Sequence, residues 1–218
     1  MDTITRPIRV VFDTRSWDYR SKTWLAYAGL FGLAAGDTLR YLVGWVGFGI
    51  WSAVLTVLVL TMLVNSKPMP TIKRIPWPMT ALFALMLGSS LLSDYRLISI
   101  GAWASSVITA SYGLWLAHAF DWRHILRVFA NTIRFILGAS MAFELVAAVI
   151  VRGPILPIFK NFDGDVVPSK AYYWTQGNLF NGERIQGILG NANLLAYVAM
   201  IGLVIFAVEE GAIAPTSF

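Results

Sequence analysis

The sequence contains no cysteine, and only 13% of its 218 residues are charged. The absence of cysteine excludes disulfides and thiolate metal sites. The low charge argues against a soluble domain, in which roughly 25% of residues are charged. Asn-x-Ser/Thr acceptors for N-glycosylation are also absent from the sequence.

Apolar residues make up 57% of the sequence and are gathered in long blocks. A membrane-spanning helix needs about 20 such residues in a row. We therefore predict an all-α, polytopic membrane helical bundle whose main partner is the lipid bilayer. The net charge of +5 does not indicate a nucleic-acid partner, because the cations lie in short hydrophilic gaps rather than in a basic stripe.

Six apolar blocks are predicted to span the membrane. They run from Trp24 to about Leu42, from about Gly44 to Val64, from about Trp77 to Leu92, from Leu97 to Phe120, from about Phe129 to Val151 and from about Ile185 to Val208. The first block is weakened by Gly36, Asp37 and Arg40. The chain then divides into a cytoplasmic segment 1–23, a transmembrane domain 24–208 with an outer loop 152–183, and a short tail 209–218.

The distribution of lysine and arginine orients these spans. Most of the cations lie in the N-terminal segment and in the gaps after the second and fourth blocks, whereas the gaps after the first and third blocks hold only Arg40 and Arg96. Positive charge stays in the cytoplasm, so both termini are predicted to lie inside, in a multi-pass protein of the inner (plasma) membrane. Residues 24–35 could instead form a signal-peptide core. The long, partly acidic stretch before them favours a retained first span.

The last block opens with an unusual polar stretch, Arg184-Ile-Gln-Gly187-Ile-Leu-Gly190-Asn191-Ala-Asn193-Leu-Leu-Ala196. Polar groups are costly in hydrocarbon unless they are partnered, so they mark a candidate functional site. Two local structures are compatible with this stretch: one helix over 184–208, or a helix that begins at Asn191 as its N-cap. In the second, free N–H groups, the glycines and Arg184 would form an anion site. Alternatively, the glycines allow close helix packing and the asparagines bridge helices.

Glu144 is a second polar residue at membrane depth, about two turns inside the outer end of the fifth block. A buried carboxylate needs a partner, and Arg152 or Arg184 are the nearest cations by depth. Glu144 could form a structural ion pair, relay protons or position a bound cation. The outer loop carries an aromatic run, residues 172–174, that could rest at the interface as a belt or contact a substrate. Both histidines, His118 and His124, are expected at the cytoplasmic end.

The pattern from Arg184 to Ala196 resembles the R-x-x-G-x-x-x-N-P-N-x-x-A signature of the O-antigen ligase and polymerase superfamily, with Ala192 in place of the proline. A weaker resemblance is that of Gly88–Tyr95 to the "S-x-x-W-S-x-D-P" region of the same superfamily. The resemblance implies a membrane glycosyltransferase. Such an enzyme transfers a glycan from a polyprenyl pyrophosphate carrier to an acceptor glycan or lipid on the extracytoplasmic side, without a cofactor or metal.

The resemblance also assigns roles to residues of the motif. Arg184 matches the catalytic arginine expected near the pyrophosphate, and the substrate-binding positions around it match Gly187, Gly190, Asn191 and Asn193. We add Glu144 and Arg152 as candidate substrate-binding residues because of their depth.

Members of the superfamily have more spans and a later outer loop with a histidine. This sequence ends at Phe218, so we expect a truncated chain with donor-side elements only, which would be inactive alone. A transporter or channel subunit and a non-catalytic membrane scaffold are the alternative functions.

Overall fold

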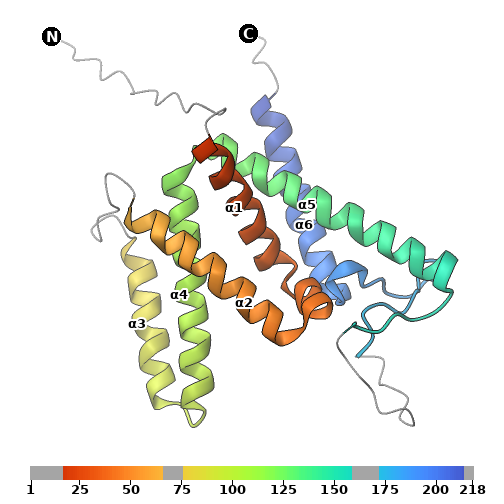
Figure 1. The fold of residues 1–218 in the computed structure, drawn as a ribbon, viewed down its shortest axis with the longest axis horizontal. Helices are drawn as coiled ribbons and strands as arrows, with labels where there is room; N and C mark the ends of the chain where they lie inside the picture. The colour runs from red at the N-terminus through yellow and green to blue at the C-terminus, as the bar shows by residue number, and fades with distance from the viewer. Residues whose placement is uncertain (1–16, 66–75, 159–171, 214–218) are drawn as a thin grey trace.

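The computed structural model describes residues 17–65, 76–158 and 172–213, and six α-helices make up most of this part (Figure 1). They are α1 (Trp17–Ala34), α2 (Gly36–Val64), α3 (Trp77–Leu92), α4 (Arg96–Ala119), α5 (Trp122–Leu145) and α6 (Ala192–Ile213). A π-helical turn, Val146–Val151, extends α5, and a 3₁₀ turn, Gly187–Leu189, precedes α6. Within the described residues β-structure is limited to one antiparallel bridge between Ile155 and Thr175. The predicted all-α class is confirmed.

Four helical segments are long and apolar enough to cross a membrane, namely Gly36–Val64, Arg96–Ala119, Trp122–Val151 and Ala192–Glu209. The helix α3 is apolar but has only 16 residues. Large apolar side chains on these helices point away from the protein, for example Val46, which is 78% exposed, and Leu97, which is 89% exposed. Apolar surface of this extent is stable only against lipid. The chain is therefore a multi-pass membrane protein.

The helices alternate in direction between the two ends of the bundle. The start of α1, the junction of α4 and α5 and the end of α6 lie at one end, at the top of Figure 1. The hairpin between α3 and α4 and the turn before α6 lie toward the other end, which we call the outer end. The assignment of the first end to the cytoplasm stays a prediction from the charge distribution.

The first predicted span, Trp24 to Leu42, is wrong as a single helix. The helix α1 begins at Trp17, so residues 17–23 are helical, and it ends at Ala34. The helix α2 then starts at Gly36 and kinks at Gly44, whose φ of 72° lies in the left-handed region that favours glycine. Residues 36–43 thus form a short helical piece at the outer end, set at an angle to the rest of α2 (Figure 1).

The sixth predicted span is displaced along the chain. Its helix begins at Ala192 rather than at Ile185, and it continues to Ile213, so residues 209–213 of the predicted tail are helical. The fifth span begins earlier than predicted, at Trp122. Residues 1–16, 66–75, 159–171 and 214–218, with the predicted features that fall on them, lie outside the described residues.

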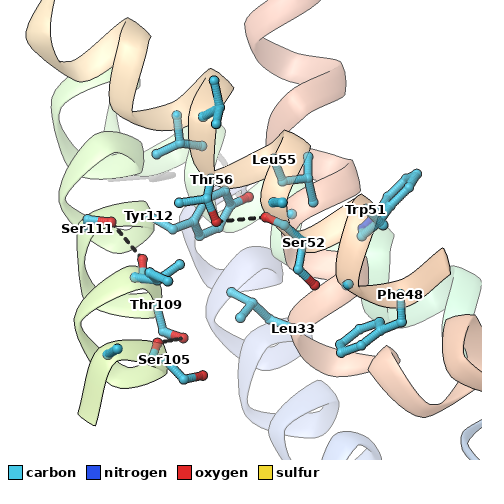
Figure 2. Close-up of a pocket in the computed structure, with 18 of the residues that line it drawn as sticks. Leu33, Phe48, Trp51, Ser52, Leu55, Thr56, Ser105, Thr109, Ser111 and Tyr112 are labelled. Carbon is cyan, nitrogen blue, oxygen red and sulfur yellow. Dashed lines mark hydrogen bonds between the residues drawn. The ribbon is translucent and has the colours of Figure 1, made fainter. Parts of the chain in front are cut away.

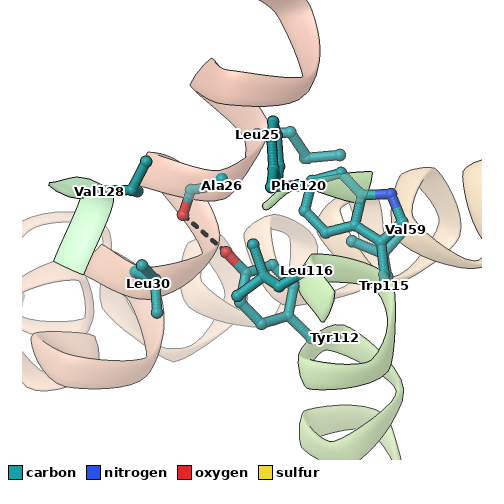
Figure 3. Packing of buried hydrophobic residues seen from close by; sticks show 9 residues of the cluster. All are labelled: Leu25, Ala26, Leu30, Val59, Tyr112, Trp115, Leu116, Phe120 and Val128. Carbon is teal, nitrogen blue, oxygen red and sulfur yellow. Dashed lines mark hydrogen bonds between the residues drawn. The ribbon is translucent and has the colours of Figure 1, made fainter. Parts of the chain in front are cut away.

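The helices α1, α2 and α4 enclose a half-open groove of about 690 Å³ (Figure 2). Next to it lies the first buried apolar cluster, in which these helices meet α5 (Figure 3). The Tyr112 hydroxyl donates a hydrogen bond to the Ala26 carbonyl at 2.6 Å, so the ring is fixed against α1. Gly29 admits this ring, because a Cβ there would lie 2.3 Å from it. The cluster consists of Leu25, Ala26, Leu30, Val59, Tyr112, Trp115, Leu116, Phe120 and Val128.

A second buried cluster joins α5, α6 and the turn before α6, and it positions the candidate site. Its members are Ala35, Ile133, Ile136, Ile188, Leu189, Leu195 and Val198. Toward the end opposite to the outer end, the same two helices are linked by an ion pair, in which Arg134 Nη2 lies 2.6 Å from Glu209 Oε2. The helix pair α5 and α6 is therefore fixed by apolar packing and, at one end, by a charged contact.

Candidate functional site

The structure decides between the two predicted forms of the Arg184–Ala196 stretch. The side-chain oxygen of Asn191 accepts hydrogen bonds from the backbone N–H groups of Asn193, at 2.9 Å, and Leu194, at 3.3 Å. This is the geometry of an N-cap, so the helix begins directly after Asn191 and the single helix over 184–208 is excluded. The helix starts sharply although Ala192 replaces the proline of the superfamily signature.

Gly187 and Gly190 both have left-handed backbone conformations, with φ of 59° and 65°. A Cβ at Gly187 would lie 2.6 Å from Ser140, and a Cβ at Gly190 would lie 2.3 Å from the ring of Tyr41. Each glycine is thus required for its φ and for the close approach of a neighbouring side chain. Close packing is part of their role, as the alternative interpretation held, but the contacts are made by a turn and not by a helix face.

Glu144 lies behind this turn and holds it in place. The residue is 1% exposed. Its Oε1 atom accepts three hydrogen bonds, from the backbone N–H groups of Gly187 at 2.7 Å and Gln186 at 2.9 Å and from the Thr175 hydroxyl at 2.8 Å. Hydrogen bonds to a charged group are about twice as strong as neutral ones. Glu144 therefore joins α5, the outer loop and the turn before α6.

The predicted ion pair of Glu144 is not what the structure shows. Within the described residues Glu144 contacts neither Arg152 nor Arg184 as an ion pair. Backbone N–H groups of the turn approach the carboxylate from the same depth and take the place of the arginines. The second oxygen, Oε2, and Oε1 of Gln186 are buried without a hydrogen-bond partner in the described part of the chain.

Ile188 is the point at which three other elements hold the turn. Its carbonyl accepts hydrogen bonds from Thr38 Oγ1 at 2.8 Å and from Trp174 Nε1 at 2.7 Å. Its backbone N–H donates to Ser140 Oγ at 3.3 Å. The backbone of the turn is thus connected to α2, to the outer loop and to α5.

Trp174 is a structural residue rather than part of an interfacial belt. It is 6% exposed, and its ring packs against Tyr41 at 5.6 Å and Phe143 at 4.9 Å between ring centroids. Four residues that contact the turn or its anchors were not predicted from the sequence, namely Thr38, Tyr41, Ser140 and Thr175. Ser140 lies four residues before Glu144 and therefore on the same helix face. This spacing is the one sequence signal that indicates a further contact between α5 and the turn.

The candidate arginines lie at the surface of the outer end. Arg184 is exposed, and no ion pair or side-chain hydrogen bond is found for it within the described residues. Arg152 is exposed as well, and it is the one described non-glycine residue with positive φ, 56°, at the end of the π-helical turn. Arg40 is engaged, since it pairs with Asp37 at 3.1 Å and lies over the ring of Trp45 at 4.7 Å.

The predicted backbone anion site is already occupied by the protein's own oxygen atoms. The N–H groups of Gln186 and Gly187 bind Glu144, and those of Asn193 and Leu194 bind Asn191. An external anion would therefore meet the guanidinium of Arg184 rather than this backbone. In the described part of the chain no cluster of three His, Asp or Glu side chains that could hold a metal ion is found.

Both histidines lie at the opposite end of the bundle from this site. His118 is in the last turn of α4, and His124 is in the first turn of α5. The His124 ring forms a hydrogen bond with the Tyr19 hydroxyl at 2.8 Å and stacks on Phe120 at 4.6 Å. These contacts connect α1 to the start of α5. Among the described residues, the outer end therefore has no histidine.

The chain matches no protein-family model, no curated protein and no solved structure.

Proposed function

We propose that the turn of residues 184–191 binds the pyrophosphate of a polyprenyl-linked glycan. On this proposal the protein is a membrane glycosyltransferase of the O-antigen ligase and polymerase type that acts at the outer end. The observation that carries it is an exposed arginine, Arg184, which has no ion pair within the described residues and lies on a turn that the buried Glu144 fixes to α5. The turn lies at the end of the bundle opposite to the start of α1 and the end of α6 (Figure 1).

The reaction needs a positive group at the leaving phosphate. The bond between the anomeric carbon of the glycan and the phosphate oxygen breaks, and the electron pair stays on the pyrophosphate of the lipid. The acceptor hydroxyl oxygen forms the new bond to the anomeric carbon, and its proton passes to the released pyrophosphate or to water. A guanidinium forms paired hydrogen bonds with phosphate oxygens and stabilises the negative charge that grows as the bond breaks.

The fixed turn makes this interaction effective. A donor that is held in position before the reaction loses little free energy to reorganisation when charge develops. Arg184 is two residues before the Gln186 N–H that Glu144 accepts, and four before Ile188, which is held on both sides of its peptide unit. The backbone that directly follows Arg184 is thus anchored, while the side chain of Arg184 is exposed.

The described residues supply the donor side of this reaction only. A base for the acceptor proton is not offered by Glu144, which is buried under Thr175 and two amides, nor by His118 and His124 at the opposite end. The proposal accordingly assigns Arg184 to the leaving group, and Arg152 and Asn193, which are also exposed, would contact the same headgroup.

Deletion of the gene and complementation test this proposal. Loss of the protein should raise the cellular pool of one polyprenyl pyrophosphate-linked glycan, measured by mass spectrometry of lipid extracts, and should remove that glycan from its acceptor. The complete gene should restore transfer both in its wild-type form and with Arg96→Ala, an exposed arginine at the start of α4. Arg184→Ala should not restore it, although it inserts normally. An unchanged lipid-linked pool after deletion would refute the proposal and favour a transporter or scaffold.

A further inference from the structure

The groove between α1, α2 and α4 has the size of a ligand site. Its volume of about 690 Å³ lies within the range of roughly 300–1,000 Å³ that is typical of small-molecule pockets. Two of its walls, α2 and α4, are apolar enough to cross a membrane. The groove is half open, so it faces the hydrocarbon layer in which these helices lie.

The chemistry of the groove is that of a hydrocarbon site. No charged side chain of the described residues lines it. Three hydroxyl groups of its walls donate to their own helices, Thr56 to the Ser52 carbonyl at 2.7 Å, Thr109 to the Ser105 carbonyl at 3.0 Å and Ser111 to the Ile108 carbonyl at 2.7 Å (Figure 2). The Tyr112 hydroxyl donates to α1, so these four protons are unavailable to a ligand.

Two glycines leave open space along the groove. A Cβ at Gly49 or at Gly101 would meet no heavy atom within 4 Å. Small residues in membrane helices usually bring two helices into contact, and a glycine in a helix costs about 1 kcal/mol relative to alanine. Here no helix approaches either glycine, so their missing side chains widen the groove instead.

The width of the groove favours a single chain over a helix. On α4 the lining runs from Gly101 to Tyr112, a rise of roughly 16 Å, which gives the groove a mean cross-section of about 40 Å². A helix with a diameter of about 10–12 Å has roughly twice that cross-section or more. A helix from a second copy could lie across the opening but would not fill the groove.

We propose that this groove binds one hydrocarbon chain of a lipid, acyl or prenyl. The inference is independent of the proposed glycosyltransferase activity, because the groove and the turn of residues 184–191 share no residue. It assigns to α2 and α4 an ordered lipid rather than the exchanging lipids that cover the other outward faces.

Photo-crosslinking in nanodiscs tests this proposal. One arm uses a phospholipid with a diazirine in the middle of an acyl chain, and the other uses a prenyl phosphate with a diazirine in its chain. Peptide mass spectrometry should find adducts concentrated on the groove residues of α2 and α4, such as Ser52 and Ser105. Displacement of the phospholipid probe by unlabelled prenyl phosphate identifies a prenyl chain, and retention of the probe identifies an acyl chain.

Filling the groove should remove these adducts. Gly101→Leu and Gly49→Leu should reduce groove labelling by at least about tenfold, and the smaller Gly101→Ala should reduce it less. Gly113→Leu is the matched control, since it lies on the same helix, also has open space at its Cβ and does not line the groove. Elution as a single monodisperse species verifies the fold of each variant.

Three outcomes would overturn the proposal. The first is unchanged labelling in folded Gly101→Leu, and the second is equal labelling on all outward helix faces, including Leu203 of α6. The third is efficient oxidative linkage between two copies of Gly101→Cys, which would place a second copy, and not a lipid, on the groove.

Discussion

Glu144 is the residue whose replacement tests the architecture of the outer end. Its Oε1 accepts three hydrogen bonds, and hydrogen bonds to charged groups contribute about 1.5–3 kcal/mol each. These contributions are not additive, and each buried donor that is left without an acceptor costs about 1–3 kcal/mol, so two such donors give about 2–6 kcal/mol. We expect Glu144→Ala to lower the free energy of unfolding by this amount, because two backbone N–H groups then lose their acceptor.

The isosteric change Glu144→Gln separates the hydrogen bonds from the side chain's volume. The amide oxygen can accept the same three hydrogen bonds, and the NH₂ group replaces Oε2, which has no partner among the described residues. The charge is lost and a buried NH₂ group now needs an acceptor, so we expect a destabilisation of about 1–3 kcal/mol, less than for Glu144→Ala. Glu183→Ala, an exposed carboxylate of the same loop, is the control and should change stability by less than about 1 kcal/mol.

Two measurements report the effect. The first is the unfolding free energy of the purified protein from an SDS titration in mixed micelles. The second is the rate at which maleimide labels Ser140→Cys, a 3% exposed position behind the turn, which the absence of cysteine makes a single target. Labelling should accelerate strongly with Glu144→Ala and little with Glu144→Gln. Equal effects of the two substitutions, or no effect of either, would refute the role of Glu144 as the anchor of the turn.

Three further predictions follow from other contacts. Gly190→Ala should destabilise the protein by about 2 kcal/mol or more, because the φ of 65° strains alanine and its Cβ would collide with Tyr41. Tyr41→Ala in the same chain should recover the part of the loss that is due to the collision. Full tolerance of Gly190→Ala in the SDS titration would contradict this geometry. Arg134→Ala should destabilise the protein by about 1–3 kcal/mol, because it leaves the largely buried Glu209 unpaired. The double variant Arg134→Ala with Glu209→Gln should be less destabilised. Simple additivity of the two free-energy changes would exclude a coupling between these residues. Single cysteines at Ser93 and Gly182 should react with a membrane-impermeant maleimide added outside intact cells, and one at Asp121 should react only after the cells are permeabilised; the reverse pattern would invert the predicted topology.

The fold was largely predictable because apolar blocks reveal helices. The block from Trp77 to Leu92 coincides with α3, and the fourth block differs from α4 by one residue at each end. The first block failed because a composition window cannot register a chain reversal at Ala35 or a kink at Gly44, which depend on backbone dihedral angles. The start of α6 was predicted in one of two alternatives, since Asn191 is a preferred N-cap residue.

Part of the turn before α6 could be predicted from the sequence, but its connections could not. Unusual residues at membrane depth indicated Glu144, Gly187, Gly190 and Asn191, which meet at this turn, and their function stays a prediction. Their partners come from α2 and the outer loop, which lie far away in sequence, as with Thr38 and Thr175. Depth alone suggested a cation for Glu144, but backbone N–H groups of a turn have no sequence signature, so the actual partners could not be identified.

Chemical rescue of Arg184→Cys tests the central functional proposal most directly. In this cysteine-free chain, the substitution should abolish glycan transfer in cells that have no other copy of the protein. A cationic methanethiosulfonate reagent that cannot cross the membrane, added from outside, should restore part of the transfer, and an anionic reagent of similar size should not. Full activity of the unmodified variant, or equal responses to the two reagents, would contradict a role for a positive charge at this position.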